Sequence, residues 1–488
     1  MNAVEIRMTS LNFTNSEENS HMKKTIKLAV VAAMALGTTS VFATNGDVMI
    51  GQGAKSRSMG GVGIAKSFGA ESALANPAMI TSVESMEVTG AVTVFMPNVQ
   101  FQSDAMEVAN PMAPSVGYDK SSSDLSVIPE IYFAQRINES FTYGIAVAGT
   151  AGMGVDYSDT PFMQSGDNGA FQMKTALQLL KVAVPVTYEI AGVTLGVAPV
   201  LQYGSLQMGH RVGNPKAVKP DGSDAFVSHE SDTATDTNFG FEVGAAYNFK
   251  DVGVEGLTIG AVYKSKIEME YKDTISASMK SFNVSSVTSG DSLDQPAEFG
   301  IGFAYDVMNT GNTISIDYKN IAWGDAAGYK DFGWENQNVY ALGYEYAAKS
   351  WALRAGYNYA KNPIKELDGS KAPLTGPMPT NYDGAAVNFF NMAGFPGIVE
   401  QHFTLGGGYA FTEMFSMDGA FIYAPQTKAS YDTSAMTEGF VAQGANAKIP
   451  DNPNKPAQIA GAVANAGTST ADVKHSQMAV TIAATFKF

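Results

Sequence analysis

The sequence predicts an all-β fold: a transmembrane antiparallel up-and-down β-barrel of about fourteen strands, with an N-terminal hatch inside its lumen. Many segments alternate bulky apolar residues with small or polar ones, and this period of two is typical of a strand whose faces differ. The connections between these segments alternate between short and long. No segment after residue 43 offers 18 consecutive apolar residues, so a chain integral to a membrane has to span it with strands.

The composition suits strands and turns, and it excludes several classes of function. The chain has 49 Gly, 21 Tyr and 27 Phe, and only 16% of its residues are charged, which favours strands over helices. Its 31 Lys and Arg against 47 Asp and Glu give a net charge of -16, which excludes a nucleic acid held by phosphate neutralisation. The absence of Cys excludes disulfides, thiolate metal sites and cysteine nucleophiles.

The first elements are a leader and an upstream extension. Residues 22–43 begin with a basic stretch, continue with an apolar run at 28–36 and end in small residues at Ala43. This order predicts a secretory signal peptide, cleaved so that the mature chain starts at Thr44. A membrane-anchoring helix would need about 20 apolar residues, roughly twice this run. Residues 1–21 are interpreted as an upstream extension.

The strands have two unlike faces, as the last predicted strand illustrates. One face carries Met478, Val480, Ile482, Phe486 and Phe488, and the other carries Gln477, Ala479, Thr481, Ala483 and Thr485. A soluble β-sandwich is the alternative, but its outward faces would be wet and rich in charge. Gly and Ala dominate the second face here, which favours a lumen packed with other protein. A Lys or Arg on the lipid face would cost about 2–4 kcal/mol.

The connections set the strand count of the predicted barrel, residues 84–488. Short links lie near residues 138–140, 190–192, 250–256, 307–312, 347–350 and 412–414. Long ones lie near 103–124, 158–173, 210–236, 270–295, 324–336, 361–398 and 428–472. Six short and seven long connections predict about fourteen strands, with periplasmic turns, extracellular loops and both chain ends in the periplasm.

Residues 44–83 precede the first strand, do not alternate, and are rich in glycine. A phosphate-binding loop would need a Gly-Lys-Ser/Thr ending between a strand and a helix, and this segment has none of these. A compact hatch is the better interpretation, because small residues let the backbone fold tightly in a lumen lined by Gly and Ala. Irregular backbone at membrane depth is tolerated only where protein or water surrounds it.

A resemblance to a known family becomes specific at these residues. The hatch or gating residues that carry it are Asn45, Gly46, Ser56, Arg57, Gly60, Gly61, Asn76, Pro77 and Ala78. Pro129 and Pro185 within strands, and Pro363-Ile364 after the strand at 351–359, add to it. In their order and spacing they resemble the FadL/TodX family of outer-membrane transporters for long-chain fatty acids and hydrocarbons.

The resemblance implies passive uptake of hydrophobic small molecules through a plugged barrel in the outer membrane of a Gram-negative bacterium. Ligand would pass from an extracellular groove to an internal pocket and leave sideways beside a kinked third strand. That strand is residues 141–157, and Gly149, Gly152 and Gly154 support a kink because glycine weakens the strand ladder. The alternative is that these glycines make room for a close neighbour. The family's hatch contact at the kink would fall on Asn76, Pro77 and Ala78.

Two long loops are unusually apolar. Their predicted ligand-capture residues are Phe162, Met163, Phe171 and Met173 in one loop, and Phe389, Phe390, Met392 and Phe395 in the other. Flexible Met and flat Phe suit an oily ligand, although the two loops could instead pack on each other over the barrel mouth. Basic residues for a ligand carboxylate are candidates by strand face alone: Arg136, Lys181, Lys264 and Arg354. Arg354 could equally pair with Glu345, so fatty acid and hydrocarbon both stay open.

The remaining predictions concern partners and alternatives. Expected partners are a hydrophobic ligand, outer-membrane lipid and lipopolysaccharide, and the barrel insertion machinery, which would read the terminal Phe488. A general porin or an adhesin is the alternative function, but a porin would not need a Gly-rich segment ahead of its first strand. An outer-membrane lipase or protease is less favoured, since the five His have no triad or metal spacing. No catalytic residue, metal ligand or cofactor is predicted.

Overall fold

The structure is a computed structural model that describes residues 45–109, 117–158, 171–218, 224–375 and 378–488. The predicted leader, residues 22–43, and the upstream extension, residues 1–21, lie outside the described residues. So do Thr44 and two predicted capture residues, Phe162 and Met163. For Phe171 only the backbone is described.

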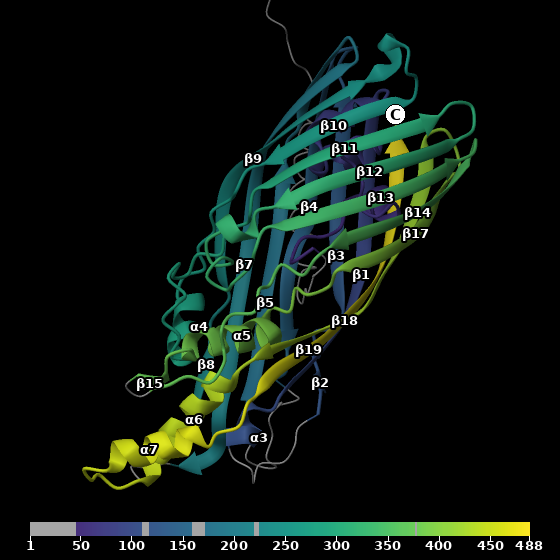
Figure 1. The fold of residues 1–488 in the computed structure, drawn as a ribbon. Coiled ribbons are helices and arrows are strands. Elements are labelled where there is room, and N and C mark those ends of the chain that lie inside the picture. The colour runs from purple at the N-terminus through teal and green to yellow at the C-terminus, as the bar shows by residue number, and fades with distance from the viewer. Residues whose placement is uncertain (1–44, 110–116, 159–170, 219–223, 376–377) are drawn as a thin grey trace, which may run out of the picture.

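The strands form a closed antiparallel barrel of 14 strands (Figure 1). β1 (Met86–Ser103) pairs along its whole length with β19 (Thr470–Lys487), and this pairing closes the cylinder. The barrel strands between them are β3 (Ser126–Arg136), β4 (Phe141–Asp156), β5 (Phe171–Ala183) with β6 (Val186–Ile190), β7 (Val193–Val218), β9 (Ala234–Asn248), β10 (Leu257–Lys264), β11 (Glu298–Val307), β12 (Asn312–Ile321), β13 (Gln337–Ala347), β14 (Trp351–Ala360), β17 (Gln401–Ala410) and β18 (Phe415–Asp432). The fold class predicted from the sequence is confirmed.

Local chemistry explains the interruptions in this pattern. β5 and β6 make one barrel strand, broken at Pro185, which has no N–H for the ladder. β2 (Asp119–Lys120) and β8 (Asp224–Glu230) extend the sheet beyond the wall, pairing with β1 and β7. Bulky apolar residues such as Phe403 and Leu405 are exposed on the outside, while their neighbours His402 and Thr404 are buried inside. Such alternation gives one face to lipid and the other to the lumen.

The two ends of the barrel differ, as the connection lengths predict. Short turns lie at the end where the backbones of Met86 and Phe488 hydrogen-bond to each other. The long loops at the other end carry α3 (Ala105–Ala109), α4 (Ile275–Ser281), η5 (Trp323–Asp325), α5 (Tyr382–Gly394), α6 (Ser434–Lys448) and α7 (Lys455–Ala464), together with the small hairpin of β15 (Leu374–Thr375) and β16 (Met378–Pro379). The turn between β9 and β10 contains η4 (Phe249–Val252). No helix in the described ranges has the length and apolar character to cross a membrane.

The barrel wall is taller on one side than on the other. β7 has 26 residues and β1, β18 and β19 have 18 each, whereas β10 has only 8. Figure 1 shows the short strands β10 to β14 at the end that carries the C-terminus, with α4 and α5 beyond them. The loops that leave the short strands therefore complete the enclosure on that side.

Residues 45–83 lie inside the barrel. They contain α2 (Gly53–Ser58), η1 (Gly69–Leu74) and η2 (Pro77–Ser82), which contact strands all round the wall. Glycines on the inner face let this hatch approach closely. A Cβ atom added to Gly356 would lie 2.1 Å from the backbone nitrogen of Gly60, and one added to Gly244 would lie 1.8 Å from the Asn76 side chain. Glycines on the inner faces of the strands thus leave the space that the hatch occupies.

Candidate functional site

The candidate site lies where β4 leaves its neighbour β3. The two strands pair from Arg136 and Thr142 up to Glu130 and Ala148, and no further. Beyond Ala148, β4 pairs with β5, and the register of that pairing shifts between Gly149 and Ala151. Such a shift is a β-bulge, which bends a strand. β4 is the third strand of the barrel, so the bulge lies on the strand that the sequence marks for a kink.

The bend leaves a gap in the hydrogen-bonded wall. Residues 126–129 of β3 pair with β1 on one side, but on the other side they have no ladder partner in β4, whose pairing with β3 ends at Ala148. We call this gap the seam. It ends on the extracellular side at Asp156, whose backbone oxygen accepts from Ser122 N at 2.8 Å and whose backbone nitrogen donates to Ser121 Oγ at 2.9 Å.

The first described hatch residues, 45–49, fill the free edge of β4 at the seam. Gly152 N donates to the Asp47 oxygen at 3.0 Å, and Met49 N donates to the Thr150 oxygen at 3.1 Å. Val48 and Ala151 form the antiparallel bridge between these bonds. The segment itself is a tight turn, because Asn45 N donates to the Val48 oxygen at 3.0 Å. We call residues 45–49 the N-terminal turn.

Three aromatic residues from the loop between β12 and β13 pack against the N-terminal turn. Trp323, Tyr329 and Trp334 pack against one another with ring centroids 4.6–5.1 Å apart. Gly46 has a φ of 67° and lies so close to them that an added Cβ would be 2.7 Å from Trp323 and 2.8 Å from Trp334. Only glycine suits both the conformation and the space. We call these three residues the aromatic cage.

Asp47 joins the turn to the cage through its side chain. The Tyr329 hydroxyl donates to Asp47 Oδ2, while Oδ1 has no hydrogen-bond partner among the described residues. Burial raises the pKa of the Asp47 carboxyl to about 7, and the Tyr329 hydrogen bond opposes that rise. Glu298 and Lys181 also face this carboxyl, the first raising its pKa and the second lowering it.

An apolar cavity adjoins the cage and the kinked strand. It is narrow, because the centre of a water-sized molecule has only about 10 Å³ in which to move. Its lining residues are Met153, Leu206, Met208, Ile275, Leu293, Tyr329, Phe332, Trp334, Asn391 and Phe395. Met153 belongs to β4 beside the seam, and Tyr329 and Trp334 belong to the cage. A molecule in this cavity would therefore touch both the kinked strand and the residues that hold the N-terminal turn.

A second, polar chamber borders the N-terminal turn. Val48, Thr150 and Ala151 form part of its wall. Its charged groups are Lys181, 3.9 Å from Glu242, and Lys264, 3.5 Å from Glu298. Neither carboxylate oxygen of Glu242 has a hydrogen-bond partner among the described residues. The N-terminal turn thus borders a charged chamber through Val48, while the cage residues Tyr329 and Trp334 border the apolar cavity.

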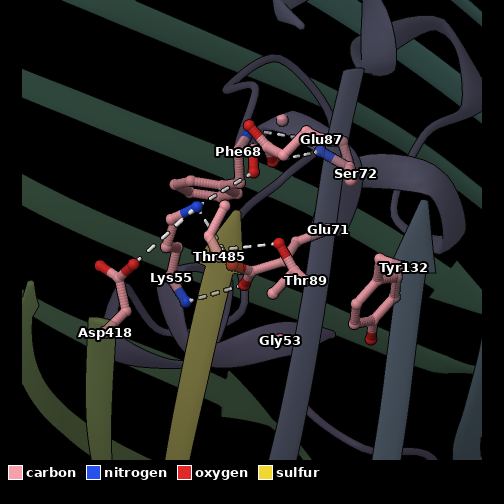
Figure 2. Close-up of polar contacts among 12 residues, drawn as sticks. Gly53, Lys55, Phe68, Glu71, Ser72, Glu87, Thr89, Tyr132, Asp418 and Thr485 are labelled. Atoms are coloured by element: carbon pink, nitrogen blue, oxygen red, sulfur yellow. Dashed lines mark hydrogen bonds and ion pairs between the residues drawn. The ribbon is translucent and has the colours of Figure 1, made fainter. Parts of the chain in front are cut away.

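The body of the hatch is fixed more firmly than its N-terminal turn. Arg57 is fully buried, pairs with Glu130 of β3 and donates to Thr93 Oγ1 at 2.8 Å. Figure 2 shows Lys55 between Glu71, at 3.1 Å, and Asp418 of β18, at 3.9 Å. Breaking a buried ion pair by removing one partner costs about 3–5 kcal/mol. The pairs with Glu130 and Asp418 join the hatch to the wall and resist its movement as a whole, whereas Lys55 and Glu71 pair within the hatch. The turn is held mainly by backbone hydrogen bonds and one side chain.

Comparison with known proteins places the chain in a family. The family described as outer membrane protein transport protein (OMPP1/FadL/TodX) matches residues 40–372. The chain belongs to this family. Outer membrane protein P1 of Haemophilus influenzae is 20% identical over 421 residues, covering 76% of this chain and 85% of that protein. The chain is therefore a multi-pass protein of the Gram-negative outer membrane and a channel of the hydrophobic-compound type.

Solved structures share this fold. A FadL homologue of Pseudomonas aeruginosa superposes with a TM-score of 0.60 at 14% identity, covering 91% of this chain and all of the other. The toluene transporter TodX of Pseudomonas putida gives 0.58 at 16% identity, with 91% and 100% covered. The CymD monoaromatic hydrocarbon channel gives 0.51 at 16% identity, with 90% and 98% covered.

The Asn-Pro-Ala segment does not lie where the resemblance to the family implies. Asn76 donates to the Ile64 oxygen at 2.7 Å, and the Pro77 oxygen accepts from Thr187 Oγ1 at 2.8 Å. The segment packs against Gly196 of β7 and Gly244 of β9, so its assignment to the kink is corrected to Asp47–Met49. The free edge of β4 needs extended backbone with available N–H and C=O groups, whereas Pro77 lacks the N–H and begins a helical turn.

The other predicted hatch residues have structural partners. Ser56 Oγ donates to the Val62 oxygen at 2.7 Å, and Gly60 N donates to Thr404 Oγ1 at 2.9 Å. Gly61 has a φ of 84° and lies against the Ile50 backbone, so no side chain fits there. Asn45 is fully buried, and its side-chain amide has no hydrogen-bond partner among the described residues.

The predicted capture residues whose side chains the structure describes are buried. Phe389, Phe390 and Met392 lie on α5, where Phe390 stacks on Phe332 with centroids 5.3 Å apart. Met173 packs against Gly394 at the end of the same helix. Packing of the loops over the barrel mouth, the alternative left open by the sequence, is the arrangement observed for these residues. Phe395 differs, because it lines the apolar cavity.

The four basic candidates separate into two groups. Lys181 and Lys264 line the polar chamber. Arg354 instead pairs with Glu345 at 2.6 Å and Asp418 at 2.7 Å, and Arg136 donates to the Val83 oxygen at 3.1 Å. Four residues of the site, Asp47, Tyr329, Trp323 and Trp334, were not predicted from the sequence. A carboxylate inside a glycine-rich hatch was the one local signal for Asp47; the cage residues gave none.

Proposed function

We propose that this channel takes up hydrophobic small molecules, long-chain fatty acids or aromatic and aliphatic hydrocarbons, by passive movement through the apolar cavity and sideways through the seam. In this proposal the N-terminal turn closes the seam at rest and moves aside when ligand enters. The observation that carries the proposal is the insertion of Asp47–Met49 along the free edge of β4. Two solved relatives, described as a toluene transporter and a monoaromatic hydrocarbon channel, agree with this class of ligand.

The height of the seam supports a lateral exit. On the outer face, Val127 and Pro129 of β3 border the seam, and they pair with Val94 and Val92 of β1. Val92 is exposed on the lipid side. An opening between these residues would face hydrocarbon rather than water, which suits an apolar molecule because it stays out of water as it leaves.

The fit of the hatch disfavours a straight route to the periplasm. Hatch backbone lies against inner-face glycines such as Gly260 and Gly356, and ion pairs with Asp418 and Glu130 of the wall hold Lys55 and Arg57. A general porin, the alternative function, would require an open lumen. The apolar cavity, by contrast, borders the seam through Met153 and the cage through Tyr329, so ligand could displace the turn directly.

A disulfide that locks the turn tests the proposal. Val48 and Ala151 are a non-hydrogen-bonded antiparallel pair, since the bonds flanking them join 49 to 150 and 152 to 47. Cβ atoms in such pairs are close enough for a disulfide, and the chain has no other Cys. In proteoliposomes, we expect oxidised V48C/A151C to take up labelled toluene and oleate at least about tenfold more slowly than the wild-type protein. Reduction of the disulfide should restore the uptake rate.

The matched control is T89C/T485C, which joins β1 and β19 where the two hydroxyl groups are 2.9 Å apart. This disulfide links two wall strands at a position outside the seam, so it should leave uptake unchanged. Uptake that persists in oxidised V48C/A151C would contradict the proposal. High single-channel conductance of the wild-type protein would favour a porin instead.

We also propose that Phe488 is the residue read by the barrel insertion machinery. Its side chain is 58% exposed, and its backbone nitrogen donates to the Met86 oxygen at the periplasmic end. An aromatic side chain left accessible at the last position of the closing strand is available to a partner. The proposed transport function assigns no catalytic step, cofactor or metal to the chain.

A further inference from the structure

A row of lysines crosses the outer surface of the tall wall. β18, β19, β1 and β2 are neighbours, and their registers align Lys428 with Lys474, Lys474 with Gln100, and Gln100 with Lys120. Directly paired residues of antiparallel strands point to the same face. The inward positions beside them, His475 and Phe101, are buried, so the row faces outward. We call Lys120, Lys428 and Lys474 the lysine row.

The lysine row lies just beyond the lipid-facing belt. The last apolar row on this wall is Tyr423, Met478 and Met96. Ser476 and Asn98 follow it, and Lys474 and Gln100 come next. Four residues of strand from Met96 to Gln100 rise about 13 Å at about 3.3 Å each, or about 10 Å along the membrane normal at a tilt near 40°. This places the ammonium groups at the level of lipid headgroups.

The charges of the row are only partly satisfied within the protein. Lys120 pairs with Asp124 at 2.6 Å, and Lys474 Nζ lies 3.4 Å from the centre of the exposed Tyr118 ring. Within the described part of the chain, Lys428 and Lys474 have no carboxylate within ion-pair distance. Asp472, one row further out, accepts from Thr470 Oγ1. In a protein of net charge -16, three aligned lysines at headgroup level form a local positive site.

We propose that the lysine row binds the phosphate groups of an outer-leaflet lipopolysaccharide molecule. Its lipid A carries phosphates at the top of the hydrocarbon layer, at the height of the row, while its acyl chains would lie against Val92, Val94 and Met96 of β1 below. Basic side chains beside a membrane surface attract anionic headgroups, and lysine binds phosphate as a compact charge. The lysines themselves lie on the outer surface, outside the lumen and the cavity of the proposed transport route, so their replacement leaves the lining of that route unchanged.

Native mass spectrometry in detergent tests the assignment. Wild-type protein is titrated with bisphosphoryl lipid A, and the K120Q/K428Q/K474Q variant is compared with it. About fivefold per lysine is the usual gain near an anionic surface, so we expect at least about tenfold weaker binding by the variant, and intermediate binding of monophosphoryl lipid A by wild type. The matched control, K349Q/K365Q/K448Q, removes equal charge from exposed positions elsewhere and should bind like wild type.

Three outcomes would overturn the proposal: equal lipid A binding by the row variant, equal loss in the control variant, or displacement of lipid A by millimolar inorganic phosphate. The last result would identify a free-phosphate site instead of a lipid site. Toluene uptake in liposomes without lipid A should be the same for the row variant and wild type, so a failure of this proposal and a failure of the transport proposal are distinguishable.

Discussion

At the scale of single residues, Asp47 couples the hatch to the extracellular loops. Its backbone oxygen accepts from Gly152 on the kinked strand, and its carboxylate accepts from Tyr329 in the aromatic cage. Burial raises its pKa to about 7. The turn is therefore held in place most firmly when this carboxyl is protonated and neutral.

Uptake should depend on pH through Asp47. In a displaced turn the carboxyl would return towards its ordinary pKa of 3.8, from about 7 in the closed arrangement. Between these values the closed form binds the proton and the displaced form does not, so lowering the pH through this window stabilises the closed form. Each tenfold difference in proton affinity between the two forms corresponds to about 1.4 kcal/mol. Toluene uptake, whose substrate does not titrate, should therefore be at least about fivefold slower at pH 5 than at pH 8.

The D47N variant is the control, because an amide copies the neutral carboxyl and cannot ionise. Its uptake should be nearly independent of pH between 5 and 8. A D47N protein that keeps the wild-type pH profile would assign the dependence to other groups, among which Glu298 and Lys181 face this site.

At the scale of elements, the hatch packs closely against the barrel strands at positions where the strands carry glycine. The Gly60 nitrogen of the hatch lies where a side chain on Gly356 of β14 would begin. Bulk at such a position cannot be absorbed by a flexible side chain, because backbone is the neighbour. The element that would have to move is the hatch.

We predict that G356L displaces the hatch and opens the lumen. Single-channel conductance in planar bilayers should rise well above the low wild-type level, and bacteria expressing the variant should become sensitive to large polar antibiotics. The matched control is G90L on β1, since a Cβ atom added to Gly90 meets nothing within 4 Å. Conductance that stays low in a folded G356L protein would show that the hatch tolerates the added bulk.

At the scale of the whole molecule, the tall and the short side of the barrel wall carry different features. The tall side of the barrel carries the seam on β4 and the lysine row on β2, β18 and β19. The short strands β10 to β14 leave room for the loops that line the apolar cavity. Asn45, the first described residue, is fully buried.

The leader pattern of residues 22–43 predicts where the mature protein begins. A basic stretch, an apolar run and small residues before Thr44 are typical of a signal peptide that is removed on export. Intact mass analysis of protein from outer membranes should give a chain of residues 44–488. A folded protein in the outer membrane that retains residues 22–43 would contradict this expectation.

The sequence by itself determined the repeating parts of this protein. Alternation of bulky and small residues depends on neighbours two positions apart, so it predicted two-faced strands, and alternating loop lengths predicted their number. Glycines along β4 marked the strand that bends. These are local properties, and local properties can be read without knowing which strands meet.

Tertiary structure decided which residues meet at the site. The kink contacts Asp47–Met49 and not Asn76–Ala78, because the free edge of β4 accepts extended backbone. No short sequence motif indicates which segment will supply that backbone. Phe389 and Phe390 are buried because α5 packs on loops that leave other strands. Lys120 and Lys474, 354 positions apart in sequence, share a row only through the register of β1 with both neighbours. Such contacts arise from register and closure of the barrel, which depend on the whole chain.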